Sequence, residues 1–329
     1  MTHDSAAVRR PSSRVRSGLM LALVSSASFG LSGALARGLL DAGWTPGAAV
    51  LARIAIAALV VTPLGLRDLA GRWHLLARNS GVVVVYGLLA VAGAQFCYFS
   101  AVQHMQVGPA LLIEYTAPAV VVLWLWLRQG QRPGRVTVLG AALATAGLVL
   151  VLDLFSGADV SLLGVAWALG AMIGAATYFI LNADESNGLP PLTLAAGGLV
   201  VATLVLGALG AVGVLPMAGS LDAVDYGTVA GSVSVPWWLP LALLGVVTAG
   251  VAYTTGIAAG RRLGSRLASF VSLTEVLTAV VFAWLLLAEL PGLVQLLGGV
   301  LVLAGVVAVK LGEDRSVTSA TERPEPVPA

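Results

Sequence analysis

The sequence predicts an all-α integral membrane protein with about ten transmembrane helices in two inverted five-helix repeats. Of its 329 residues, 58% are hydrophobic and only 10% are charged, whereas about 25% are charged in a typical soluble domain. The apolar residues form continuous runs of about 20 residues, which is the length that crosses a bilayer as a helix. The two halves of the chain also share a pattern of matching residues.

The apolar runs follow one another along the chain, with polar loops between them. The segment 1–17 is rich in arginine and the segment 311–329 ends in ERPEPVPA, so we expect two disordered tails. The predicted spans cover about 18–40, 46–66, 80–102, 108–127, 136–152, 161–181, 192–215, 238–258, 267–287 and 292–310.

The placement of basic residues predicts the orientation of the spans. Lys and Arg gather in both tails and in the loops after spans 2, 4 and 8, while the loops on the opposite side contain neither. Short loops rich in Lys and Arg stay on the cytoplasmic side. The sequence therefore predicts a multi-pass protein with both termini in the cytoplasm.

Residues 107–151 and 265–309 match at a shift of about 158 residues. We therefore interpret 18–152 and 161–310 as two copies of one unit, which the odd number of spans per copy places in opposite orientations. We expect the glycines to form close helix contacts. The matching pairs include Ala110 with Ala268, Val122 with Val280, Trp126 with Trp284, Pro133-Gly134 with Pro291-Gly292, Gly140 with Gly298, and Gly147 with Gly305.

Several kinds of chemistry find no support in the residues. The single cysteine excludes an internal disulfide, and the three histidines lie far apart, so no metal site is predicted. No HExxH, GxSxG or P-loop motif occurs. We therefore expect no catalytic residues, no cofactor and no nucleic-acid partner. The expected partners are a small-molecule substrate and the lipid bilayer, with protons and a homodimer left open.

The segment PALLIEYTAP places Glu114 and Tyr115 just before Pro118 inside an apolar run. A carboxylate at membrane depth costs on the order of 3 kcal/mol or more unless it faces a partner or a watery cavity. Pro118 has no N–H for the carbonyl of Glu114 four residues earlier, so it predicts a helix break. We interpret this segment as the wall of a transport pathway. A purely structural Glu–Arg pair is the alternative.

Arg53, Tyr98 and Glu114 fall in the outer parts of spans 2, 3 and 4, so they can face one cavity. An amino acid requires an anion for its ammonium group and a cation for its carboxylate. Glu114 and Arg53 would supply these charges, with Tyr98 or Tyr115 forming hydrogen bonds. The alternative is that Arg53 and Glu114 only neutralise each other, since intramembrane charges usually pair.

Glu275 is the second intramembrane acid, near the middle of span 9, with Ser272 close to its helical face. We consider it a candidate for proton transfer, and a structural contact between the repeats is the alternative. Two further charged residues are interpreted more simply. Glu289 is expected to solvate a helix end, and Arg37 to extend its side chain to the membrane interface.

Two segments resemble EamA-type members of the drug/metabolite transporter superfamily. These are LARIAIAALVV in span 2 and TEVLTAVVFAWLLLAELPGLVQLLGGVLVLAGV in spans 9 and 10, where Glu275 and Glu289 occupy the acidic positions of the family pattern. Val276 replaces the usual proline, and Gly130-Gln131 replaces the acidic turn of the first repeat. The segment ALLIEYTAPAVVVLWLWLR is similar to the threonine/homoserine exporter branch.

The resemblance implies a secondary transporter in the plasma (inner) membrane of a prokaryote. It would export small metabolites such as amino acids by alternating access, with proton coupling left open. The alternative is a channel or uniporter for drug-like or other metabolite substrates. A membrane-embedded enzyme is disfavoured because the loops are short and carry little polar chemistry.

Overall fold

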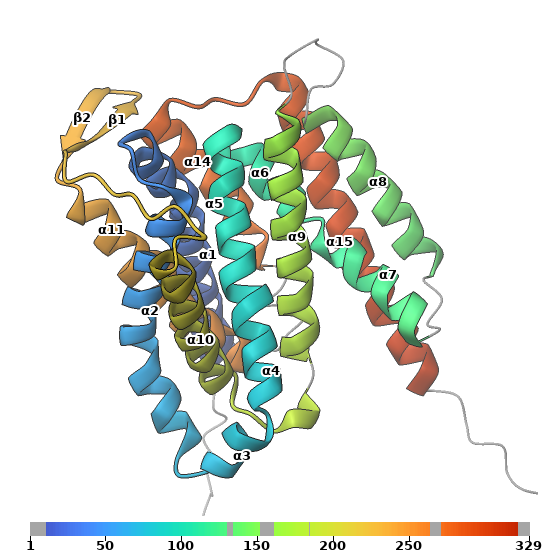
Figure 1. Cartoon of the computed structure of the whole chain (residues 1–329). Helices are drawn as coiled ribbons and strands as arrows, with labels where there is room; N and C mark the ends of the chain where they lie inside the picture. The colour runs from blue at the N-terminus through green and yellow to red at the C-terminus, as the bar shows by residue number, and fades with distance from the viewer. Residues whose placement is uncertain (1–10, 130–133, 152–160, 184, 264–270, 322–329) are drawn as a thin grey trace, which may run out of the picture.

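The computed structural model describes residues 11–129, 134–151, 161–183, 185–263 and 271–321. These residues are almost entirely helical (Figure 1). Among them, 7 helices are long and apolar enough to cross a membrane, and shorter apolar helices cover Arg135–Val151, Thr274–Leu287 and Leu293–Val309. These helices confirm the prediction of a helical, multi-pass membrane protein.

The regular elements among the described residues of the first half are all helices. The side chain of Thr45 caps the second helix by accepting a hydrogen bond from the Ala48 N–H, and proline occupies the first helical position. The elements are α1 (Pro11–Asp41), α2 (Pro46–Leu69), α3 (Trp73–Arg78), α4 (Ser80–Val85), η1 (Tyr86–Gly93), α5 (Ala94–His104), α6 (Val107–Glu114), α7 (Ala117–Gln129) and α8 (Arg135–Val151).

The second half adds a β-hairpin to its helices. Its elements are α9 (Leu162–Ala183), η2 (Glu185–Asn187), α10 (Pro191–Ala211), β1 (Val224–Thr228), β2 (Gly231–Val235), α11 (Trp238–Gly245), η3 (Val246–Val251), α12 (Ala252–Leu263), α14 (Thr274–Leu287) and α15 (Leu293–Thr321).

Two segments, η1 and η3, are π-helical. Each lies inside a long helix, between α4 and α5 in the first half and between α11 and α12 in the second. At the predicted shift of about 158 residues, η3 coincides with the last part of η1. Short π-helical segments within α-helices often lie at functional sites, so this matched pair directs attention to the residues beside it.

The hairpin is a feature that the sequence analysis missed, since residues 216–237 were expected to be a loop. Strands β1 and β2 pair antiparallel, with Val224 opposite Val235. The hairpin lies at the opposite end of the helices from α3 (Figure 1). An isolated two-stranded hairpin is marginally stable at best, and this one is anchored by Tyr226, whose hydroxyl donates to the Leu35 carbonyl over 3.2 Å. Its ring packs on Gly38 of α1.

Helices at both ends of the chain extend beyond the predicted spans. Helix α1 begins at Pro11, whereas a disordered tail was expected over 1–17. Helix α15 continues to Thr321, although a disordered tail was expected from Leu311. Hydropathy falls where the apolar run ends, but a helix needs only suitable backbone geometry, and the first proline after Pro291 is Pro324.

Helices α8 and α15 pack side by side through their glycines (Figure 1). A Cβ atom on Gly140 would lie 2.7 Å from the carbonyl oxygen of Gly305, and one on Gly147 would lie 2.6 Å from that of Gly298. The earlier glycine of α8 thus meets the later glycine of α15, so the helices run antiparallel. Gly140 thus contacts Gly305, which the predicted repeat matches with Gly147, and Gly147 contacts Gly298, which it matches with Gly140.

Some predicted features lie outside the described residues. These are the turn at Gly130-Gln131, Pro133, Ala268 and the boundary region 153–160 between the two predicted repeats.

Candidate functional site

The fourth predicted span is interrupted close to Pro118. Helix α6 ends at Glu114 and α7 begins at Ala117, with a turn between them. The Thr116 hydroxyl donates to the Ile113 carbonyl over 2.7 Å. This hydrogen bond satisfies one of the carbonyl groups at the end of α6. Pro118 lies in the first turn of α7, where a missing N–H removes no helical hydrogen bond. The interruption therefore leaves Glu114 as the last residue of a broken helix.

The second half has a similar interruption at the equivalent position. Leu273 forms a turn immediately before α14, and the Thr274 hydroxyl donates to the Val271 carbonyl over 2.7 Å. At the repeat shift of about 158 residues, Thr274 corresponds to Thr116 and Val271 to Ile113. The same local hydrogen bond thus recurs at both interruptions, although only the first half has a proline nearby.

The two interruptions meet at a hydrogen bond between Tyr115 and Glu275. The Tyr115 hydroxyl lies 2.6 Å from Oε2 of Glu275 and 3.3 Å from the backbone oxygen of Ser272. Both side chains are partly buried. Three residues singled out from the sequence, one from the first half and two from the second, are therefore brought together.

Replacing Tyr115 with phenylalanine is expected to reduce transport about tenfold, because a hydrogen bond to a charged group contributes roughly 1.5–3 kcal/mol. Initial rates in proteoliposomes would measure the effect. Tyr226→Phe is the matched control, since it also removes a buried, hydrogen-bonded hydroxyl but lies on the hairpin. Equal rates in the two variants would contradict a transport role for the Tyr115 hydroxyl.

Arg53 is buried, with only 3% of its surface exposed. Its Nη1 donates to Oε1 of Gln95, and its Nη2 donates to the Thr248 carbonyl over 3.0 Å. Its guanidinium carbon also lies 5.5 Å from the centre of the Phe99 ring. Within the described ranges, the ion pairs are Arg37 with Asp41 and Arg261 with Asp68. The alternative in which Arg53 pairs directly with Glu114 is therefore not what the structure shows.

The predicted residues nevertheless form one electrostatically connected group. Arg53 lies within electrostatic range of Glu114 and Glu275, and the two glutamates interact with each other. Tyr98 is 7% exposed. Its hydroxyl reaches α1 at Gly33, where a Cβ atom would lie 2.5 Å from the oxygen. The absence of a side chain at Gly33 thus makes room for Tyr98.

The sequence analysis did not identify the residues that hold Arg53. These are Gln95 and the backbone of Thr248. The side chain of Tyr253 lies beside Gln95 and interacts with it. A glutamine inside an apolar span was a usable signal, because such a side chain needs partners in lipid. No sequence signal could identify Thr248, since it contributes its backbone carbonyl.

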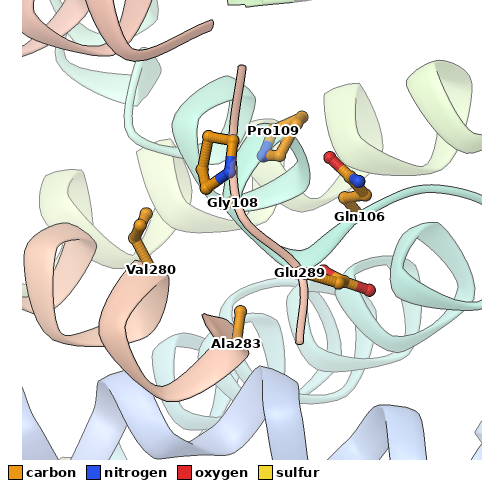
Figure 2. Close-up of a pocket in the computed structure, with 7 residues that line it drawn as sticks. Gln106, Gly108, Pro109, Val280, Ala283 and Glu289 are labelled. Carbon is orange, nitrogen blue, oxygen red and sulfur yellow. The ribbon is translucent and has the colours of Figure 1, made fainter. Parts of the chain in front are cut away.

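Glu289 contacts the first turn of α6 instead of solvating its own helix end. One of its carboxylate oxygens accepts a hydrogen bond from the Val107 N–H over 3.2 Å, a favourable place for a negative charge. Figure 2 shows Glu289 beside a small pocket between α6 and α14. Its lining residues are Gln106, Gly108, Pro109, Val280, Ala283, Glu289 and Pro291.

Arg37, near the C-terminal end of α1, is held by two hydrogen-bonding partners. It forms an ion pair with Asp41 at 3.0 Å and donates to the Val102 carbonyl over 2.8 Å. The end of α1 is thereby attached to the end of α5.

Glu289 predicts a pH dependence of stability. Burial raises the pKa of its carboxyl above the ordinary value, while the Val107 N–H and Arg37 act in the opposite direction. The folded state therefore binds this proton more readily than the unfolded state, and the resulting stabilisation is lost as the pH rises through the folded-state pKa. Glu289→Gln keeps an acceptor for Val107 but cannot ionise. As the pH rises above the ordinary pKa of a glutamate, the melting temperature of this variant is expected to increase relative to that of wild type. A difference that is constant with pH would exclude this titration.

A family model described as the EamA-like transporter family matches residues 16–153 and 162–311. The threonine/homoserine exporter RhtA of Salmonella typhimurium is 26% identical over 304 residues, which cover 91% of this chain and 92% of the exporter. The pseudopaline exporter CntI of Pseudomonas aeruginosa is 26% identical over 308 residues, which cover 90% of this chain and 96% of that protein.

The fold is also found in a solved structure. A crystal structure of another protein superposes with a TM-score of 0.58 at 20% identity, covering 96% of this chain and 99% of that chain. At this identity the likeness concerns the fold alone. The two matched segments account for most of the chain. The matching family and the named relatives are transporters, not enzymes. The chain belongs to the EamA-like transporter family of the drug/metabolite transporter superfamily.

Proposed function

We propose that this protein is a secondary exporter of small metabolites of the amino-acid class that works by alternating access. The observation that carries the proposal is the hydrogen bond between Tyr115 and Glu275, which joins the interrupted helices of the two halves. Secondary transporters commonly bind substrate where discontinuous helices meet between repeats. Two relatives that align over most of their length are named as exporters, one of threonine and homoserine and the other of pseudopaline.

The proposed architecture has ten spans in two inverted five-helix repeats, 18–152 and 161–310. The antiparallel, reciprocal glycine contacts of α8 and α15 and the matched helix interruptions support it. The distribution of basic residues supports an inner-membrane orientation with both termini in the cytoplasm. The hairpin and the pocket beside Glu289 would then face the exterior.

In the proposed site, Glu114 is the counterion for the substrate ammonium group and Arg53 is the counterion for its carboxylate. Tyr98 and Tyr115 provide hydroxyl groups. Glu275, held by Tyr115 beside Ser272, would exchange a proton as the halves move. Both glutamates are within electrostatic reach of the same arginine, so a proton or an ammonium group can balance the second negative charge. This arrangement supports the proposal of proton coupling.

The test is transport by the purified protein in proteoliposomes, with labelled L-threonine and L-homoserine as probes. Saturable uptake that is accelerated by unlabelled substrate on the opposite side would support a carrier. Its response to an imposed pH gradient would support proton coupling. Uptake that rises linearly with concentration and shows no counterflow would instead indicate a channel. An absence of uptake for both amino acids would overturn the proposed substrate class.

A further inference from the structure

Arg53 is held between the two π-helical segments of the molecule. Gln95, which accepts from Nη1, follows η1 in the first half, and Thr248, whose carbonyl accepts from Nη2, lies within η3 in the second half. The position of this guanidinium therefore depends on both halves of the chain. A π-helical turn shifts the following side chains around the helix axis. Here one π-helical segment directly precedes Gln95 and the other contains Thr248.

Both side-chain and backbone acceptors of Arg53 are electrically neutral. They orient the guanidinium but leave its positive charge uncompensated by direct pairing. Glu275 receives its hydrogen bond from Tyr115. The Nε atom of Arg53 is buried and has no hydrogen-bond partner among the residues that the structure describes. A buried donor without an acceptor is unfavourable, and a substrate carboxylate would provide one.

Gln95 is itself held in place. Its side chain lies close enough to the Tyr253 hydroxyl to interact with it, and the Tyr253 ring packs edge-on against Phe29 with centroids 5.2 Å apart. A glutamine amide has one acceptor oxygen and one donor nitrogen. Because the oxygen accepts from Arg53, the amide orientation is specified, and a chain of contacts runs from Phe29 to the guanidinium.

We propose that Gln95 and Tyr253 are positioning residues that hold Arg53 ready for a substrate carboxylate, so that the site prefers amines carrying a carboxylate over the same amines without one. This inference rests on the proposed function and specifies its substrate class further. The preference for a carboxylate depends on the neutral charge of the Gln95 acceptor. A carboxylate at position 95 would pair with Arg53 and compete with the substrate.

The test compares L-homoserine with 3-amino-1-propanol, which is homoserine without its carboxylate. Each is used as a competitor of labelled L-homoserine counterflow in proteoliposomes. In wild type, homoserine is expected to inhibit at a concentration at least about tenfold lower than that of the amine. This factor corresponds to the contribution of one hydrogen bond to a charged group. In Gln95→Glu this ratio is expected to fall towards one, because the introduced carboxylate occupies Arg53.

Gln103→Glu is the matched control, since Gln103 is exposed on the same helix, α5, and its ratio should equal that of wild type. Tyr253→Phe, which leaves the charge unchanged but releases Gln95, should lower the ratio partially and keeps the inference testable if Gln95→Glu does not fold. Wild-type counterflow with an unchanged ratio in both site variants would overturn this inference alone. A wild type without amino-acid counterflow would overturn the proposed function and this inference with it.

Discussion

Gly140→Leu is expected to remove most of the folded protein. A Cβ atom at this position would lie 2.7 Å from both the Gly305 carbonyl oxygen and the Val309 nitrogen, and these are backbone atoms that cannot rotate away. The leucine must therefore separate α8 from α15. Overpacking costs typically about 1–3 kcal/mol, and close packing is a main force that associates helices in lipid. The yield of monodisperse protein in detergent and its melting temperature would measure the loss.

Gly260→Leu is the matched control for this prediction. Gly260 is also helical, but no heavy atom of the described residues outside its own helix backbone lies within 4 Å of the position that its Cβ would take. Gly298→Leu should reproduce the defect from the other helix, because its Cβ would lie 2.6 Å from the Gly147 carbonyl oxygen. If Gly140→Leu and Gly260→Leu gave the same yield and melting temperature, α8 and α15 would not require this close contact.

Glu114→Gln is expected to lower transport by a factor of ten or more while the protein remains folded. Glutamine has nearly the same shape but cannot carry the negative charge that we assign to the substrate ammonium group or to a proton. Removing one partner of a buried charge pair costs about 2–5 kcal/mol, and about 1.4 kcal/mol corresponds to a tenfold change. Initial rates of L-homoserine counterflow, normalised to reconstituted protein, would measure the loss.

Glu289→Gln makes the same chemical change at a glutamate outside the proposed site, and its transport rate should stay close to that of wild type. The melting temperature of each variant would separate lost transport from lost folding. Transport by Glu114→Gln at the wild-type rate would remove Glu114 from the site. A site without Glu114 would then have to be built around Tyr115 and Glu275.

Much of the fold was predictable because each span is a local property of the sequence. A run of apolar residues is recognisable without knowing its neighbours, and the requirement to satisfy every backbone group in lipid then makes it helical. The glycine pairs were equally informative: Gly140 and Gly147 were expected to form helix contacts, and both lie against glycines of α15. Pro118 directed attention to the place where α6 and α7 separate.

The site was only partly predictable because hydrogen-bond partners are chosen in three dimensions. Charge left open whether Arg53 pairs with Glu114, and its hydrogen bonds are to Gln95 and a backbone carbonyl. Glu289 was assigned to its own helix end, yet it contacts the start of α6. In each case the residue type indicated that a partner was needed, and only the packing of distant helices decided which one was within reach.

The sequence by itself determined that this protein lies in a lipid bilayer. It also determined the approximate length and number of its apolar segments and the chemical groups that cannot remain unpaired in lipid. These follow from transfer free energies and backbone hydrogen bonding, which act residue by residue. Only the tertiary structure decided that Tyr115 meets Glu275, that Gln95 of α5 and Thr248 of η3 hold Arg53, and that a hairpin packs on α1. Such contacts depend on how whole helices pack together, since a small rotation or shift of a helix changes every partner along it.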